Sequence, residues 1–174
     1  MSNCLNITGF SVDPQDADSI FLSAMDANPP YPEVDRQPGI LKTNGYVTVT
    51  FGTAVVTGNS YYLKINHRNS VETWSKVPVL LTTSTTYLFS SAATQAYGDN
   101  QITTFDNVGY AIFSGDINQD KAIDISDFLE LDPHIQNGDG GYIVYDINGD
   151  GAVDISDFLL LDPNIQNGIG AAIP

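Results

Sequence analysis

Cysteine, basic side chains and long hydrophobic runs are scarce in this sequence of 174 residues, and each shortage excludes something. Cys4 is the only cysteine, so no disulfide can form within the chain. Lysine and arginine total 6 against 21 aspartates and glutamates, and the formal charge of -15 would repel nucleic acid and anionic membranes. No run approaches the roughly 18 apolar residues of a membrane span. We therefore expect no nucleic-acid partner and no membrane span.

Signatures of catalysis and of export are also missing. The only histidines are His67 and His134, and the sequence has neither a G-x-S-x-G elbow nor a phosphate-binding glycine-rich loop. A glycosidase carboxylate pair among Glu72, Asp99 and Asp106 is the remaining option, which spacing alone does not demonstrate. Residues 1–30 lack a basic n-region and an apolar core, so we expect no export signal in the sequence as printed. We interpret the protein as non-enzymatic.

Negative charge is concentrated near the C-terminus. Residues 1–115 contain nine acidic and five basic side chains, whereas residues 116–174 contain twelve acidic and one basic. At 42% hydrophobic and 10% aromatic residues, the chain is too apolar for wholesale disorder. We predict a β-sandwich domain at 1–115 and an acidic segment at 116–174, which packs on that domain because no Pro- or Ser-rich linker separates them.

Short segments rich in β-branched and aromatic residues fill the first two thirds of the chain. In the clearest of them, 46–51, period-2 alternation directs Val47, Val49 and Phe51 toward a core. The pattern predicts a mainly β fold, an Ig-like antiparallel β-sandwich, with one short helix at Ser91–Tyr97. The predicted strands are Leu5–Val12, Ser19–Met25, Gly39–Lys42, Tyr46–Phe51, Tyr61–His67, Val77–Leu81, Thr85–Phe89 and Gly109–Phe113.

A duplicated segment occupies the last third of the chain. Residues 116–138 and 146–168 align without a gap at an offset of 30, and 18 of the 23 positions are identical. The apolar runs Gly109–Phe113 and Gly141–Tyr145 precede the two copies and are predicted to be strands. The five positions that differ are Gln119/Gly149, Lys121/Gly151, Ile123/Val153, Glu130/Leu160 and His134/Asn164.

Each copy begins with a twelve-residue loop in which oxygen-bearing side chains recur at positions 1, 3, 5, 9 and 12. Calcium takes roughly 6 to 8 hard oxygen ligands, and a loop that winds around it presents every second residue, with a backbone carbonyl from position 7. The lack of nearby Cys and the shortage of His argue against zinc or copper. We predict two Ca²⁺ ions. The candidate ligands are Asp116, Asn118, Asp120, Ala122 (carbonyl), Asp124 and Asp127, then Asp146, Asn148, Asp150, Ala152 (carbonyl), Asp154 and Asp157.

The loops should not close without a cation. Four carboxylates converge in each loop, and their mutual repulsion opposes closure, so we expect calcium binding and folding of this segment to be coupled. A short helix follows each loop. Ser126 and Ser156 are predicted to cap these helices, and Pro133 and Pro163 to stop them, because the residue before a proline disfavours helical geometry.

The calcium loop followed by a helix, present twice, resembles the type I dockerin repeat over residues 116–168, with Asp at the last ligand position and no helix before the loop. The resemblance implies calcium binding and a cohesin-like protein partner. In dockerins the two residues before the final ligand, often a Ser-Thr pair, help to recognise cohesin. Here they are Ile125-Ser126 and Ile155-Ser156.

Lys121 makes the two loops unequal. It occupies position 6 of the first loop, where such loops usually have Gly because the backbone takes positive φ. A lysine there costs about 1 kcal/mol of strain and places a cation near the ion. We predict that the loop beginning at Asp116 binds calcium more weakly than the loop beginning at Asp146.

A further resemblance concerns residues 67–75 and 96–100, which are similar to a stretch in extracellular modules of Bacteroidetes that also end in dockerin-like repeats. We expect Trp74 to pack within the sandwich, and Arg68 and Glu72 to pair with each other or brace loops. The alternative is a carbohydrate platform formed by Trp74 with Tyr61, Tyr62 or Tyr97.

We predict the first of three non-enzymatic functions and keep the other two as alternatives. The first is a structural or adhesive module that calcium rigidifies for protein–protein contact, including self-assembly if the segment from Cys4 to Val12 pairs with a neighbour's sheet edge. The second is an anchoring module of a secreted polysaccharide-degrading system, which binds a cohesin-like receptor. The third is a carbohydrate-binding module. We expect an extracellular or cell-surface location, because calcium there reaches the range that weak loop sites need.

Overall fold

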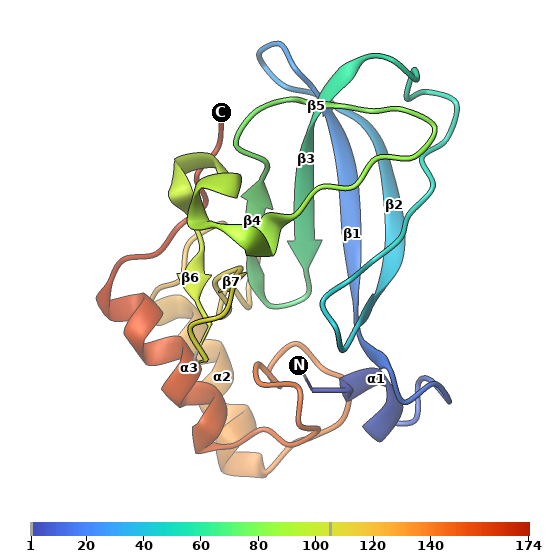
Figure 1. Cartoon of the computed structure of the whole chain (residues 1–174). Helices are drawn as coiled ribbons and strands as arrows, with labels where there is room; N and C mark the ends of the chain where they lie inside the picture. The colour runs from blue at the N-terminus through green and yellow to red at the C-terminus, as the bar shows by residue number, and fades with distance from the viewer. Residues whose placement is uncertain (1, 105) are drawn as a thin grey trace.

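The computed structural model describes residues 2–104 and 106–174, and Met1 and Phe105 lie outside the described residues. A main sheet stands beside two C-terminal helices, and the N-terminus lies near the base of both (Figure 1). No helix in the described ranges is long and apolar enough to cross a membrane. The strands are β1 (Asp16–Asp26), β2 (Glu33–Lys42), β3 (Ser60–His67), β4 (Ser70–Trp74), β5 (Val79–Leu80), β6 (Ile102–Thr103) and β7 (Tyr110–Ala111). The helices are α1 (Cys4–Ile7), α2 (Ile125–Asn137) and α3 (Ile155–Gln166), with 3₁₀ turns η1 (Phe89–Ser91), η2 (Ala93–Gln95) and η3 (Tyr97–Asp99).

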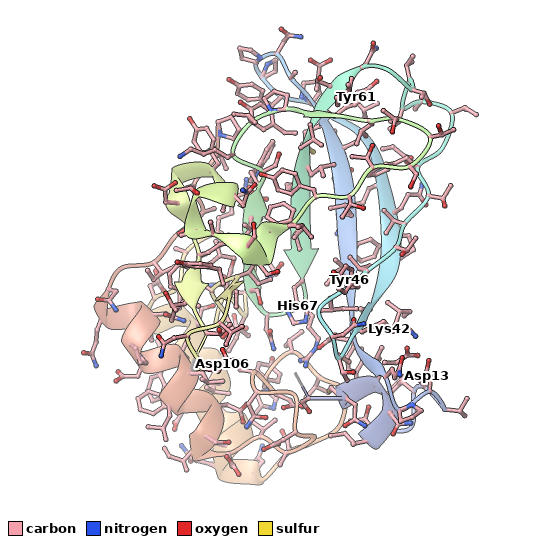
Figure 2. The ribbon with its side chains drawn as sticks, in the orientation of Figure 1. Asp13, Lys42, Tyr46, Tyr61, His67 and Asp106 are labelled. Carbon is pink, nitrogen blue, oxygen red and sulfur yellow. The ribbon has the colours of Figure 1, made fainter. Side chains whose placement is uncertain are left out.

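The main sheet has the order β2-β1-β3-β4, with β5 also paired to β3, and its pairings are antiparallel. The prediction of a mainly β, antiparallel fold is confirmed. One face is buried because alternate residues of β1 and β3 are apolar. Ala24 lies opposite Leu63 in the register, and both join a buried cluster with Tyr61 (Figure 2) and Leu81. Irregular segments cover this cluster with Phe51, Val55, Tyr87 and Phe89.

Three predicted strands of the sandwich domain are wrong. Two of them, residues 46–51 and 85–89, have no strand assignment, and the turn η1 begins at Phe89. Val47, Val49, Phe51, Tyr87 and Phe89 in these segments are nevertheless partly buried. A Cβ atom on Gly39 would lie 2.4 Å from Val47 and 2.8 Å from Val49, so the segment passes directly over β2 at a glycine. Side-chain packing therefore holds this layer where a hydrogen-bonded ladder was predicted.

The other local errors follow from short-range hydrogen bonds. Residues 5–12 are not a strand, because Asn6 and Ile7 donate backbone hydrogen bonds to the Asn3 carbonyl and begin α1. Residues 141–145 form turns in place of a strand. The helix predicted at 91–97 is a series of 3₁₀ turns, in which Gly98 has a φ of 65°.

The helices α2 and α3 are longer than predicted. Both continue through Pro133 and Pro163, which occupy interior positions. The predicted stops are wrong. The conformational penalty on the residue before each proline is smaller than the packing energy that the helix gains by continuing past it. The caps also differ: Asp124 and Asp154 are the N-caps, and each forms a capping box with the aspartate three residues later.

A second hydrophobic cluster joins the C-terminal segment to the sheet. Val71 of β4 is buried among apolar residues of both repeats. Phe128 of α2 and Phe158 of α3 pack with ring centroids 5.1 Å apart. The buried members from the repeats are Ile117, Ile123, Leu131, Ile147, Val153 and Leu161. Because side chains from both loops and both helices meet on β4, the segment is packed against the sheet.

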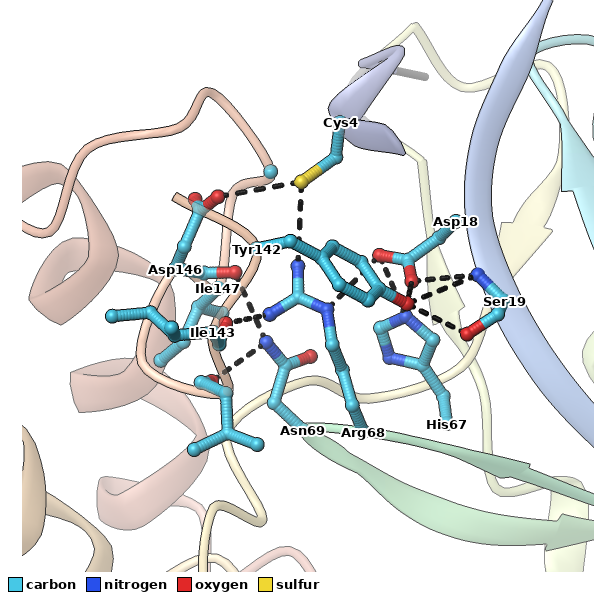
Figure 3. Close-up of polar contacts among 12 residues, drawn as sticks. Cys4, Asp18, Ser19, His67, Arg68, Asn69, Tyr142, Ile143, Asp146 and Ile147 are labelled. Atoms are coloured by element: carbon cyan, nitrogen blue, oxygen red, sulfur yellow. Dashed lines mark hydrogen bonds and ion pairs between the residues drawn. The ribbon is translucent and has the colours of Figure 1, made fainter. Parts of the chain in front are cut away.

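A polar junction lies beside this cluster, between β1, the turn after β3 and residues 142–146 (Figure 3). Asp18 accepts hydrogen bonds from Arg68 Nε at 3.2 Å and from the Tyr142 hydroxyl at 2.6 Å, and lies 3.0 Å from His67 Nε2. Arg68 also donates to the carbonyl of Ile143. Burial acts to raise the pKa of Asp18, but the hydrogen bond and charge of His67, the charge of Arg68 and the Tyr142 hydroxyl together lower this pKa to about 2.

Substitution of Asp18 tests the energetic importance of this junction. The low pKa means that ionised Asp18 stabilises the fold fully above the ordinary pKa near 3.8, and that this contribution is lost as the pH falls from about 4 through about 2. We expect Asp18→Asn to lower the free energy of unfolding by about 2 kcal/mol at pH 7, and the deficit to shrink in that acidic window. Urea titrations at one fixed calcium concentration measure both, with Asp26→Asn at the far end of β1 as the control. A deficit that stays constant from pH 7 to pH 2 would contradict the assignment.

Candidate metal centres

The two loops, 116–127 and 146–157, place their ligand candidates in equivalent positions. The first and last candidates of each loop are buried: Asp116 is 1% exposed, and Asp127, Asp146 and Asp157 are 0% exposed. The carboxylates at positions 5 and 9 of each loop are exposed. Each loop therefore has two carboxylates fixed in the interior and two at the solvent edge.

Hydrogen bonds to backbone N–H groups wind each loop around its carboxylates. Asp127 Oδ1 accepts from the N–H groups of Ile117 at 2.7 Å and Asn118 at 3.2 Å, and its Oδ2 accepts from Asp124 N at 2.9 Å. The equivalent bonds of Asp157 measure 2.7, 3.0 and 2.9 Å. The same geometry in both copies shows that the repeated residues fold the loops locally.

The residues present fit a divalent cation. Asp116 Oδ1 is buried and has no hydrogen-bond partner. Burial, and next the charge of Asp127, raise the pKa of Asp116 to about 6, and burial also raises the pKa of Asp157. A buried carboxylate without a countercharge is costly, and an all-oxygen donor set suits calcium.

The candidate ligand side chains of each loop do not converge on one point in the described residues. Among residues 2–104 and 106–174, no three Asp, Glu, His or Cys side chains form a ready-made metal cluster. The carboxylates are instead turned to loop N–H groups, as with Asp120 Oδ1, which accepts from Ala122 N at 3.0 Å. The twelve-residue assignment, with its Asn side chains and the Ala122 and Ala152 carbonyls, therefore stays a prediction.

Ile123 and Val153 occupy position 8 of the two loops, and their backbone N–H groups do not bond to the opposite loop. Ile123 N donates to the carbonyl of Ile169, in the segment after α3, at 2.8 Å. Val153 N donates to the carbonyl of Asp139, in the segment after α2, at 2.8 Å. Each loop is therefore tied to the chain that leaves the other repeat's helix, and the two copies are interlocked.

The first loop contacts β4. The Lys121 ammonium lies 3.3 Å from Glu72 Oε1, and Gln119 Nε2 is 3.4 Å from the Ser70 carbonyl. Glu72 also accepts from the Trp74 indole N–H at 3.1 Å. Arg68 and Glu72 thus hold separate loops and do not pair with each other. Lys121 has a φ of 80°, the positive value that the sequence predicted to be strained.

Sequence reasoning missed the residues that anchor the second loop. Asn69, which is 0% exposed, donates from Nδ2 to the carbonyls of Val144 at 2.9 Å and Asp146 at 3.1 Å. Cys4 lies on the other side, with Sγ 3.4 Å from Asp146 Oδ2 (Figure 3). Burial raises the pKa of the Cys4 thiol to about 12. A signal was available in the positions at which the repeats differ. Gln119 and Lys121 of the first loop contact β4 with their side chains, whereas Gly149 and Gly151, their counterparts in the second loop, have no side chain that could do so.

Comparisons with known proteins bear on the same segment. Residues 114–166 match the family model of the dockerin type I domain. This match confirms the resemblance and supports a calcium-binding, protein-interaction module in this dockerin-like segment. A chain from a type II cohesin–X–dockerin complex of Acetivibrio cellulolyticus is similar at 18% identity and a TM-score of 0.45, with 83% of this chain and 80% of that chain covered. No curated protein matches the sequence.

Calcium removal tests the coupling between the dockerin-like segment and the ion. We expect EDTA to reduce the helical circular dichroism signal of α2 and α3, and calcium, but not magnesium, to restore it, because magnesium dehydrates reluctantly and rarely occupies all-protein sites. The strand signal should persist, since the cluster around Leu63 contains no residue of the two calcium loops. Helical content unchanged by EDTA in a protein that calorimetry shows to bind calcium would contradict the coupling.

The inequality of the loops is tested at Lys121. We expect Lys121→Gly to raise the calcium affinity of the first loop roughly fivefold, since about 1 kcal/mol of strain is relieved. Lys121→Gln is the control, because it keeps the strain and removes the charge. Calorimetric titration with the second loop disabled by Asp157→Asn isolates the first site. An unchanged affinity in Lys121→Gly would rule out the explanation.

Proposed function

We propose that this protein is a non-enzymatic, extracellular or cell-surface module whose dockerin-like segment, rigidified by two calcium ions, docks onto a cohesin-like partner. The chain would then anchor in a larger assembly, as in the second of the three functions inferred from the sequence. The dockerin type I match supports this choice. Modules of that family are non-catalytic, which agrees with the absence of catalytic motifs in the sequence.

The observation that carries the proposal is an exposed apolar pair at the same place on each helix. Ile125 and Leu129 of α2 are 61% and 65% exposed, and Ile155 and Leu159 of α3 are 61% and 64% exposed. Each pair has i, i+4 spacing and so forms one patch on its helix. The inner faces of both helices already supply the cluster on Val71, so these outer residues are not needed for the fold. Exposed apolar patches of this kind mark interaction surfaces.

The calcium loops hold these patches in position. Ile125 and Ile155 are the first residues of α2 and α3, directly after the N-cap aspartates that the sequence assigns as ligands. A cation that closes the loop would therefore fix the start of the helix and the orientation of its apolar pair. Calcium dependence of partner binding follows from this arrangement.

The other two functions lose their specific support. The self-assembly route required residues 4–12 to be a strand that pairs with a neighbour, and residues 4–7 are instead helix α1. The glycan platform required an accessible Trp74, which is 6% exposed and has the edge of Tyr62 packed on it at a centroid distance of 6.1 Å. Light scattering during calcium addition still distinguishes self-assembly from anchoring, because only self-assembly produces growth without a second protein.

Partner binding is tested with a panel of immobilised type I and type II cohesin domains in calcium. We expect one-to-one binding that EDTA abolishes and that the combined variant Ile125→Asp, Leu129→Asp, Ile155→Asp, Leu159→Asp weakens at least about tenfold, since charges replace buried apolar contacts. The matched control is Val108→Asp, because Val108 is 84% exposed but lies outside the helices. An equal loss of cohesin affinity in both variants, or cohesin binding that does not depend on calcium, would contradict the proposal.

A further inference from the structure

The described N-terminal residues form a cover over the second loop. Residues 2–8, called here the N-terminal cover, include α1 and lie against residues 146–151. The Ser2 hydroxyl donates to the Gly149 carbonyl, and Cys4 Sγ lies 3.4 Å from Asp146 Oδ2. Cys4 is 1% exposed and Leu5 is 6% exposed. The close-up in Figure 3 shows the Cys4 thiol between the Asp146 carboxylate and the Arg68 guanidinium.

The contact is made with the loop backbone at two glycines. A Cβ on Gly149 would lie 3.4 Å from Cys4 Cβ and 3.6 Å from Ser2 Cβ, and a Cβ on Gly151 would lie 3.7 Å from Ile7 and Thr8. Both glycines have positive φ, 72° and 89°. The surface that the cover touches therefore exists only while the loop keeps this wound conformation.

Among the described residues, no segment covers the first loop in the same way. Its matching positions are Gln119 and Lys121, whose side chains reach β4, and the Lys121 side chain is 57% exposed. The repeats are otherwise nearly identical, so the loops provide an internal comparison. Any effect of the cover on calcium binding should be larger at the second loop than at the first.

We infer that the N-terminal cover and calcium bind the second loop cooperatively: calcium closes the loop and creates the surface on which residues 2–8 dock, and the docked cover holds the loop closed around the ion. This inference rests on the proposed calcium binding. Without the ion, repulsion among Asp146, Asp150, Asp154 and Asp157 opens the loop and removes the docking surface. Linkage is reciprocal, so the factor by which calcium favours docking equals the factor by which docking raises calcium affinity.

The single thiol of the chain reports directly on the cover. Cys4 is buried only while the cover is docked, so its reaction with iodoacetamide measures the undocked fraction. We expect labelling in saturating calcium to be at least about tenfold slower than in EDTA. The matched variants are Asp157→Asn in the second loop and Asp127→Asn in the first. Calcium protection should be lost in Asp157→Asn and retained in Asp127→Asn.

Amide hydrogen exchange on the unmodified protein gives a second readout that depends on no substitution. The N–H groups of Asn6, Ile7 and Thr8 are hydrogen-bonded to carbonyls within the cover and should exchange more slowly when calcium is present. If calorimetry shows calcium binding but neither labelling nor exchange in the cover responds, the cooperativity is absent and the proposed function stands. Equal loss of protection in both variants also overturns the inference. If calorimetry shows no calcium binding, the proposed function and the inference both fail.

Discussion

The fold of the C-terminal segment depends on compensation of negative charge at four buried carboxylates. Asp116, Asp127, Asp146 and Asp157 are at most 1% exposed, and in the described part of the chain none is ion-paired with a Lys, Arg or His side chain. Backbone N–H groups satisfy Asp127 and Asp157, but hydrogen bonds from neutral groups do not remove the charge. A divalent cation bound in each loop would compensate this charge.

Loop closure and core formation are the same event in this arrangement. The residues between the ligands, among them Ile117, Ile123 and Val153, point away from the loop centre into the cluster on Val71. A loop that opens would withdraw these side chains from β4, and α2 and α3 would lose the surface on which they pack. We therefore expect ion binding to be linked to the docking of the whole segment on the sheet.

The two nearly identical repeats contact different parts of the chain. Lys121 pairs with Glu72 of β4, whereas Gly151 admits the N-terminal cover. Asn164 donates to the Ser114 carbonyl at 2.8 Å, whereas its counterpart His134 stacks on Tyr145 with centroids 3.6 Å apart. The shared residues build the loop and helix, and the residues that differ fit each copy to its neighbours. The outer apolar pairs remain alike in both copies, and nothing in this chain covers them within the described residues.

The sequence by itself determined the loops, the repeat and the central strands, because each depends on residues a few positions apart. Ligand spacing follows from the winding of a short loop, and strand alternation follows from the period-2 backbone of β1 and β3. Only the tertiary structure decided the rest. Residues 46–51 pack over Gly39 without a ladder, α2 and α3 continue past their prolines, and Cys4 reaches Asp146 across 142 positions of sequence. These outcomes depend on packing between distant segments, whose energy outweighs local preference and leaves no periodic mark in the sequence.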